Sequence, residues 1–139
     1  MLFRSIQSLM AHNFTITIKK CFNVPKSDLF SWSDPYVKCK WREFNEKKSC
    51  KTNYVNNQVE PTWNYTFNVN NVSESGIKLV LFDHDKFSRD DKLGKIYLRR
   101  EELHSKRGSE IILPFCLKEE YLNKKASKMN DTTLVIYIQ

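Results

Sequence analysis

The stretch Asp83-His-Asp-Lys-Phe-Ser-Arg-Asp-Asp91 follows directly on an apolar run at residues 77–82. A short apolar run bounded by polar residues is typical of a buried strand, so the loop gathers carboxylates just past a strand end. Carboxylates a few ångströms apart repel one another and raise one another's pKa. A fold tolerates such a cluster when a cation binds in it or when it stays fully solvated, and one loop alone does not decide between the two.

A second acidic loop favours the cation. Asp28 and Asp34 bracket Leu-Phe-Ser-Trp-Ser, and Asp34 opens the next strand with Pro-Tyr-Val. Two such loops, each at a strand end, could meet at one rim of a sheet sandwich. The carboxylates that would meet there are those of Asp28, Asp34, Asp83, Asp85 and Asp91. Calcium takes about six to eight oxygen ligands in flexible geometry, whereas magnesium demands near-octahedral geometry and keeps its waters, so the pattern favours calcium.

Alternating apolar and polar residues predict strands along the whole chain. In residues 14–18, for example, Phe14, Ile16 and Ile18 share one face. The expected strands are 14–18, 36–42, 49–55, 63–69, 77–82, 95–98, 110–115 and 133–138, with a helical turn within 99–107 and a basic, partly helical loop at 118–130. Short strands at regular spacing indicate an all-β fold, an antiparallel β-sandwich of two four-stranded sheets.

These motifs together resemble the C2 domain family, whose members include calcium-dependent membrane-binding modules of protein kinase C, synaptotagmin and cytosolic phospholipase A2. The resemblance rests on Ser33-Asp-Pro-Tyr-Val37, on Pro61-Thr-Trp-Asn-Tyr-Thr-Phe67, and on 82–94 with its closing Leu93-Gly94. The first strand feeds directly into the first acidic loop and a good strand ends the chain, which is similar to the family's second topology, that of the phospholipases. Two departures affect the second loop: Glu60 stands where Asn commonly precedes the Pro, and the segment 51–61 is longer than usual.

The resemblance implies a ligand set for calcium as the cofactor. It assigns all five loop Asp as metal ligands, adds the backbone carbonyl of His84, and places Ser88 where it assists an outer ion in some members. It implies two ions, or one if the bound membrane completes the second site. Asp90, which precedes a matched Asp, is expected to face solvent.

Apolar residues lie between the presumed ligands, namely Leu29, Phe30, Trp32 and Phe87. They either tuck into the core or form an exposed surface that inserts into a bilayer. Clustered exposed aromatics usually mark a binding surface, and Trp favours the membrane interface, so insertion is the interpretation we test.

A basic strand face offers a second contact with lipid. In residues 36–42 the positions alternate, so Val37, Cys39 and Trp41 point inward while their neighbours point outward. In some family members lysines on this hairpin bind phosphoinositides, which assigns anionic-lipid binding to Tyr36, Lys38, Lys40, Lys48 and Lys51, with Arg42 and Lys47 beside them. The alternative is an ordinary solvated strand face, and His84 stands where the phosphoinositide-binding kinases carry Trp.

Composition limits the remaining function classes. The chain has 139 residues, 40% of them hydrophobic, and a net charge of +7, which fits one globular domain. We expect a lead-in at 1–12, either extended or a short amphipathic helix, and one domain at 13–139. The sequence shows neither a basic recognition helix nor an aromatic platform on a sheet face, so nucleic-acid binding is not expected. The four cysteines form no C-x-x-C pair, so a zinc site is not expected.

The sequence therefore predicts a non-enzymatic, monomeric, cytoplasmic module that binds phospholipid membranes peripherally when calcium rises. No nucleophile elbow or glycine-rich phosphate loop occurs. The alternatives are a protein–protein interaction module on the same fold, the regulatory domain of a larger lipid-modifying or ubiquitin-ligase enzyme, and a secreted membrane-recognition domain with oxidised cysteines.

Overall fold

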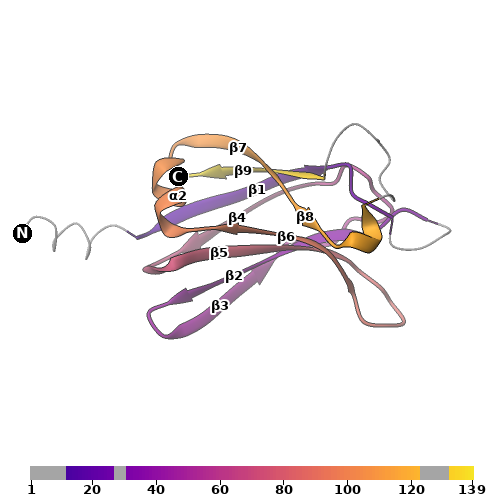
Figure 1. Ribbon diagram of the computed structural model, residues 1–139, viewed down its shortest axis with the longest axis horizontal. Helices are drawn as coiled ribbons and strands as arrows, with labels where there is room; N and C mark the ends of the chain where they lie inside the picture. The colour runs from indigo at the N-terminus through magenta and orange to yellow at the C-terminus, as the bar shows by residue number, and fades with distance from the viewer. Residues whose placement is uncertain (1–11, 27–30, 123–131) are drawn as a thin grey trace, which may run out of the picture.

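The computed structural model describes residues 12–26, 31–122 and 132–139, and these form two packed β-sheets (Figure 1). The strands are β1 (Phe14–Phe22), β2 (Pro35–Glu43), β3 (Glu46–Lys51), β4 (Thr62–Val69), β5 (Val72–Asp83), β6 (Asp91–Leu98), β7 (Ser109–Pro114), β8 (Cys116–Leu117) and β9 (Thr133–Ile138). A short α-helix, α2 (Arg100–Ser105), and a 3-10 turn, η1 (Glu119–Tyr121), lie in the two segments where helical turns were expected. Within the described ranges no helix has the length and apolar character needed to cross a bilayer.

The predicted antiparallel sandwich is confirmed, with one strand more than expected. One sheet has the order β4-β1-β9-β7 and the other has the order β3-β2-β5-β6-β8. The extra strand is β8, which pairs with β6 over only two residues and is too short to produce a readable alternation. The third strand also starts earlier than predicted, at Glu46, because its first residues are charged and give no apolar signal.

Strand order agrees with the second topology of the family. β1 leads directly toward the first acidic loop, and the last strand, β9, lies between β1 and β7. The register places Ile16 opposite Ile138 and Ile18 opposite Ile136, all four fully buried. The predicted lead-in at 1–12 lies outside the described residues except for His12 and stays a prediction.

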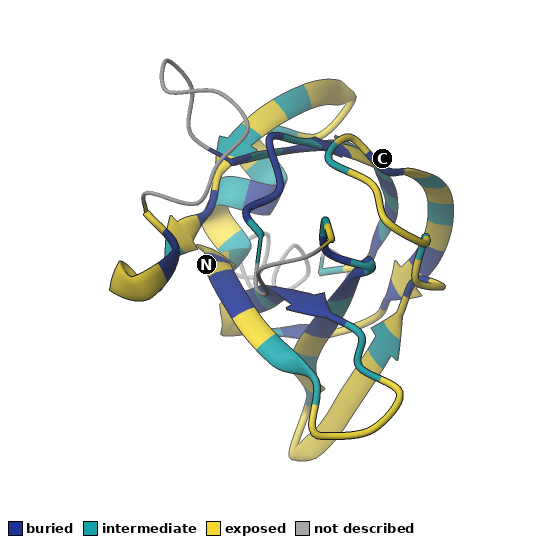
Figure 2. Cartoon of the chain, turned by 90° about the vertical axis from the view of Figure 1, so that its right-hand side faces the viewer, coloured by how far each residue is buried: buried dark blue, intermediate teal, exposed yellow. Residues whose placement is uncertain are grey.

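The core fills the space between the two sheets. Figure 2 shows the buried positions alternating with exposed ones along the strands. The inward residues of β5 are Ile77, Leu79 and Leu81, and each is essentially inaccessible to solvent. Burying one such side chain stabilises the fold by roughly 1.5–3 kcal/mol, so β5, the central strand of its sheet, anchors the acidic loop that follows it.

The two ends of the sandwich differ. At one end α2 covers the opening between the sheets with its buried Leu103, beside the β2–β3 hairpin, and at the other end the β5–β6 loop projects (Figure 1). Gly76 allows the close approach of β5 to the start of α2: its φ is +76°, and a Cβ there would lie 1.9 Å from the Leu98 carbonyl oxygen. The acidic loops are therefore held at the end away from the helix.

Candidate functional site

Neighbouring strand ends bring the described acidic residues together. Asp83 ends β5 and Asp91 begins β6, and the register pairs them; Pro35, the first residue of β2, is paired with Asp83 on its other side. Asp34 therefore stands next to Asp83. Asp34, Asp83, Asp85 and Asp91 line one hollow of about 220 Å³, together with Trp32, His84, Lys86 and Phe87. Asp28, the fifth predicted ligand, lies outside the described residues.

Hydrogen bonds fix two of these carboxylates. The backbone N–H of Asp34 donates to Oδ1 of Asp83 over 2.7 Å, and the N–H of Asn57 donates to Oδ1 of Asp34 over 2.6 Å. The His84 N–H also donates to the Asp34 carbonyl at 2.9 Å. Three loops are thus tied together at the rim, including the second loop that carries Asn57 and whose sequence departs from the family pattern.

Asp85 is held by its own loop. Its Oδ1 accepts from the Phe87 N–H at 2.9 Å and its Oδ2 accepts from the Ser88 hydroxyl at 2.8 Å. The bond from the Phe87 N–H, followed by that from Ser88, lowers the pKa of the Asp85 carboxyl. Asp85 is therefore an anion at neutral pH, and Ser88, expected to help an outer ion, contacts this carboxylate.

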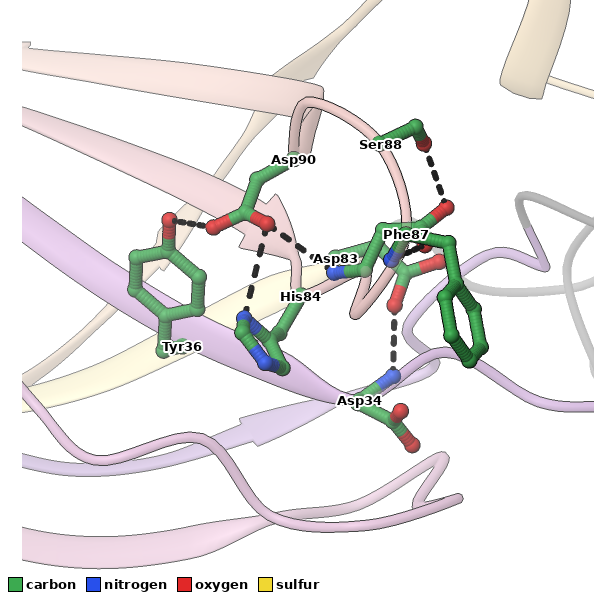
Figure 3. A network of polar contacts seen from close by, with 8 residues as sticks. Asp34, Tyr36, Asp83, His84, Phe87, Ser88 and Asp90 are labelled. Carbon is green, nitrogen blue, oxygen red and sulfur yellow. Dashed lines mark hydrogen bonds and ion pairs between the residues drawn. The ribbon is translucent and has the colours of Figure 1, made fainter.

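Asp90 has a structural role that the sequence did not indicate (Figure 3). Its carboxylate accepts hydrogen bonds from the Tyr36 hydroxyl and from the Asp85 N–H, the latter at 2.9 Å, and lies 3.4 Å from Nδ1 of His84. Burial alone would raise the pKa of Asp90, but these hydrogen bonds lower it overall. The prediction that Asp90 faces solvent is wrong, because a strand residue, Tyr36, reaches the loop and binds it; the separation of 54 positions hides this contact in the sequence.

The donor chemistry of the rim fits calcium. All its charged ligands are carboxylates, which are hard oxygen donors suited to this ion rather than to zinc. Among residues 12–26, 31–122 and 132–139, no three acidic, His or Cys side chains are close enough to hold a metal ion. Several of these carboxylates accept hydrogen bonds from the chain, which still leaves lone pairs for an ion because an ionised carboxylate has about four acceptor sites.

The two described loop-tip aromatics differ in exposure. Phe87 is 97% exposed and is not part of the hydrophobic core. Trp32 is half-buried, its N–H donates to Oδ1 of Asn57 at 2.8 Å, and the Lys26 ammonium lies 4.7 Å from the centre of its ring. Phe87 therefore does not tuck into the core, while Leu29 and Phe30 lie outside the described residues.

The outer face of the five-stranded sheet is basic over most of its area. Residues opposite each other on paired strands share a face, and the register sets Lys38 opposite both Lys51 and Val80, and Lys40 opposite Lys78. The residues of this basic face are Lys38, Lys40, Arg42, Lys47, Lys51, Lys78, Lys92 and Lys95. Lys78, Lys92 and Lys95 were missed because only strand pairing shows that β5 and β6 continue the face of β2.

Lys48, which was predicted to contact lipid together with Lys51, does not share the face of that residue. It is paired with Trp41, whose ring packs against the core and stacks on Phe67, so its side chain leaves the sheet on the side away from Lys47 and Lys51. Its ammonium forms an ion pair with Glu46 at 3.1 Å. The register of the hairpin decides this, because a difference of one residue places a side chain on the opposite face of the sheet.

The charges of the basic face are close enough to affect one another. Lys38 is the main cause that lowers the pKa of Lys40, followed by slight burial and by Lys92, Lys78 and Lys47. A hollow of about 470 Å³ opens at the hairpin end of the face, beside Lys40, Arg42 and Lys47. Such a concentration of like charge attracts anions.

Tyr36 links this face to the acidic rim. Its ring stacks on Phe82 with a centroid distance of 5.1 Å and has the Lys51 ammonium 5.7 Å from its centre, while its hydroxyl binds Asp90. Burial, followed by the bond to Asp90, raises the pKa of the Tyr36 hydroxyl. His84 stacks on Tyr54 at 4.0 Å beside it, so aromatic rings line the boundary between rim and face.

Comparison with known proteins decides the family. The C2 domain model matches residues 12–115. The chain belongs to the C2 domain family. It is 40% identical over 81 residues to Protein C2-DOMAIN ABA-RELATED 4 of Arabidopsis thaliana, covering 57% of this chain and 42% of that protein. The chain spans less than half the length of this relative and of human Synaptotagmin-7, which it also matches.

Solved C2 domains have the same fold. The first C2 domain of plant Extended Synaptotagmin 1 superposes with a TM-score of 0.71 at 20% identity, over 91% of this chain and 92% of that one. The calcium-bound pair of C2 domains of Extended-Synaptotagmin 2 gives a TM-score of 0.72 at 17% identity, over 92% of this chain and 45% of that one. The C2 domain is a non-catalytic module that typically binds calcium and lipid.

Proposed function

We propose that this C2 domain binds phospholipid membranes in a calcium-dependent manner, with the acidic rim as its ion site. The observation that carries the proposal is the arrangement at one end of the sandwich, where four Asp line a single hollow and a 97% exposed Phe87 stands at its edge. An acidic hollow beside an exposed aromatic ring suits a site that binds a cation and contacts the membrane through an apolar side chain.

Charge reversal at the rim supplies the switch. Without an ion, the carboxylates of Asp34, Asp83, Asp85 and Asp91, with Asp28 as the fifth proposed ligand, repel anionic headgroups. Calcium supplies positive charge and open coordination positions that a lipid phosphate can fill. The His84 carbonyl would complete the proposed set, and Ser88 would assist an outer ion. Binding would also stabilise the rim loops, because an ion that binds only the folded state raises stability by linkage.

Two further surfaces would add to membrane affinity. Phe87 and Trp32, with Leu29 and Phe30, would enter the bilayer interface, where aromatic side chains are favoured. On the basic face, Tyr36, Lys38, Lys40 and Lys51, together with Lys47, would contact anionic headgroups, each cation contributing about 1 kcal/mol near an anionic leaflet. The domain would then move from solution to a membrane surface when calcium rises, as a monomer.

Sedimentation with liposomes tests the proposal. The protein and its Asp83→Asn/Asp85→Asn variant are mixed with phosphatidylcholine or phosphatidylserine vesicles, with calcium or with EGTA. We expect calcium-dependent pelleting that the variant loses. Glu74→Gln/Glu101→Gln, which removes the same charge from the helix end, should pellet like the unchanged protein. Pelleting that is absent with calcium, or that the Asp variant retains, would refute the ion site.

A further inference from the structure

A second hollow, of about 350 Å³, lies on the basic face between β6 and β8, away from the hairpin. Four lysines line it, Lys78, Lys92, Lys95 and Lys118, together with Val80 and Cys116, while the Leu117 side chain packs against the core. It shares only Lys78 with the hollow at the hairpin end. We call it the β6–β8 hollow.

The wall of this hollow is built by specific backbone contacts. The register sets Gly94 opposite Leu117, and the Lys118 N–H donates to the Leu93 carbonyl at 3.0 Å. A Cβ on Gly94 would lie 2.9 Å from Leu117 Cδ2 and 3.0 Å from the Cys116 carbonyl oxygen, so the absence of a side chain there lets β8 lie against β6. The backbone at Lys118 is thereby fixed beside the strand that carries Lys92 and Lys95.

The lysines around the hollow have no acidic partners in the described part of the chain. The ion pairs found there join Lys19 to Glu110, Lys48 to Glu46, His84 to Asp90 and Arg100 to Glu74, and none involves these four lysines. The lining contains no Asp or Glu. Lys78 and Lys95 both place their ammonium groups near one ring, 5.5 and 5.6 Å from the centre of Tyr97. Like charges held together in this way destabilise a fold, and an anion bound among them removes that repulsion.

We propose that the β6–β8 hollow binds a phosphate monoester among its four lysines. Ammonium groups bind phosphate as point charges, so several lysines favour a doubly charged monoester over a singly charged diester. The ligand is either a lipid headgroup such as phosphatidic acid or a free phosphate monoester. The site needs no calcium, so it extends the anionic-lipid contact proposed for the basic face and does not depend on the acidic rim.

Vesicle binding in EGTA tests the site apart from the rim. Phosphatidylcholine vesicles carry phosphatidic acid in one sample and phosphatidylglycerol at equal total charge in the other. We expect stronger binding to phosphatidic acid, and a loss of about tenfold or more in Lys95→Ala/Lys118→Ala because two charge-assisted contacts disappear. Lys20→Ala/Lys106→Ala removes the same charge elsewhere and should bind normally. The preference should also weaken below about pH 6, where the phosphate monoester dianion gains one proton and becomes a monoanion.

Cys116 gives an independent readout, because it is exposed in the lining of the hollow, whereas Cys21 and Cys39 are buried and the partly exposed Cys50 is not part of that lining. Glycerol 3-phosphate should slow alkylation of Cys116 by iodoacetamide, and the Lys95→Ala/Lys118→Ala variant should lose this protection. Protection by glycerol 3-phosphate without vesicle binding would assign the site to a soluble ligand. Equal binding to the two vesicle types, or an equal loss in the Lys20→Ala/Lys106→Ala control, would overturn the proposal. Calcium-dependent pelleting is then measured for the Lys95→Ala/Lys118→Ala variant. We expect this variant to retain it, so that a failure of the β6–β8 hollow can be told apart from a failure of the acidic rim.

Discussion

Replacing Phe87 by alanine separates membrane insertion from folding. The ring is 97% exposed, so its removal deletes almost no buried contact in the domain. If the ring enters the bilayer, its burial contributes roughly 1.5–3 kcal/mol. Since about 1.4 kcal/mol corresponds to a tenfold change in an equilibrium constant, the variant should bind phosphatidylcholine vesicles about tenfold to a hundredfold more weakly in calcium.

The chain provides a matched control for this experiment. Phe44 is 77% exposed at the β2–β3 hairpin, at the end of the sandwich away from the acidic loops (Figure 1). Phe44→Ala should leave vesicle affinity unchanged, and both variants should keep the thermal midpoint of the unchanged protein. Vesicle titrations followed by tryptophan fluorescence measure the affinities. An affinity of Phe87→Ala within twofold of the unchanged protein, or an equal loss in Phe44→Ala, would refute insertion of this ring.

Two predictions concern the stability of the domain. Tyr36→Phe removes the hydroxyl that binds Asp90 and should lower the free energy of unfolding by about 1.5–3 kcal/mol, as expected for a hydrogen bond to a charged group. The control Tyr97→Phe, on an exposed ring of the basic face, should change the free energy of urea unfolding little. Equal effects of the two substitutions would contradict the role of the Asp90 bond. The second concerns His12 and His104, whose ring nitrogens Nδ1 and Nε2 lie 3.0 Å apart. Burial lowers the pKa of both imidazoles, with nearby Arg residues adding to it. Because the unfolded chain then takes up these protons at a higher pH than the folded one, stability should be full above about pH 6.5 and fall as the pH drops below it. Urea unfolding between about pH 7.5 and pH 5, on either side of the ordinary histidine pKa, should show this fall reduced in His104→Gln, and an identical pH dependence in both proteins would count against the pair.

The fold could be predicted because buried strands must alternate. Phe14, Ile16 and Ile18 fall on one face in the sequence and are buried in the structure, and the acidic loops fall where strands end. What could not be predicted depends on pairing between distant strands. Lys48 and Lys47 look equivalent along the chain, but a shift of one residue moves a side chain to the opposite face of the sheet. Lys92 and Lys95 join the basic face only once β6 is placed beside β5.

The site shows the same limit at the level of single contacts. The Asp residues proposed as ligands stand at fixed spacings within two loops, so local sequence suffices to propose them. Asp90 escaped because its main partner, Tyr36, lies on another strand, and its carboxylate is neither a ligand by spacing nor an exposed loop group.

We expect that same contact to couple the acidic rim to the basic face. Tyr36 belongs to the basic face, with Lys51 over its ring, yet its hydroxyl holds Asp90, and Asp90 in turn accepts from the backbone of Asp85. The loop that carries one proposed ligand is therefore positioned from the face that would contact anionic lipid. Any anion that fixes Tyr36 and Lys51 lowers the cost of ordering that loop, and by reciprocity an ion bound at Asp85 must favour the anion by the same free energy. Tyr36→Phe should thus weaken the dependence of calcium affinity on anionic lipid more than it weakens calcium binding alone, which a calcium titration with and without phosphatidylserine vesicles measures. An unchanged dependence would show that the two surfaces act separately and that the bond to Asp90 serves only stability.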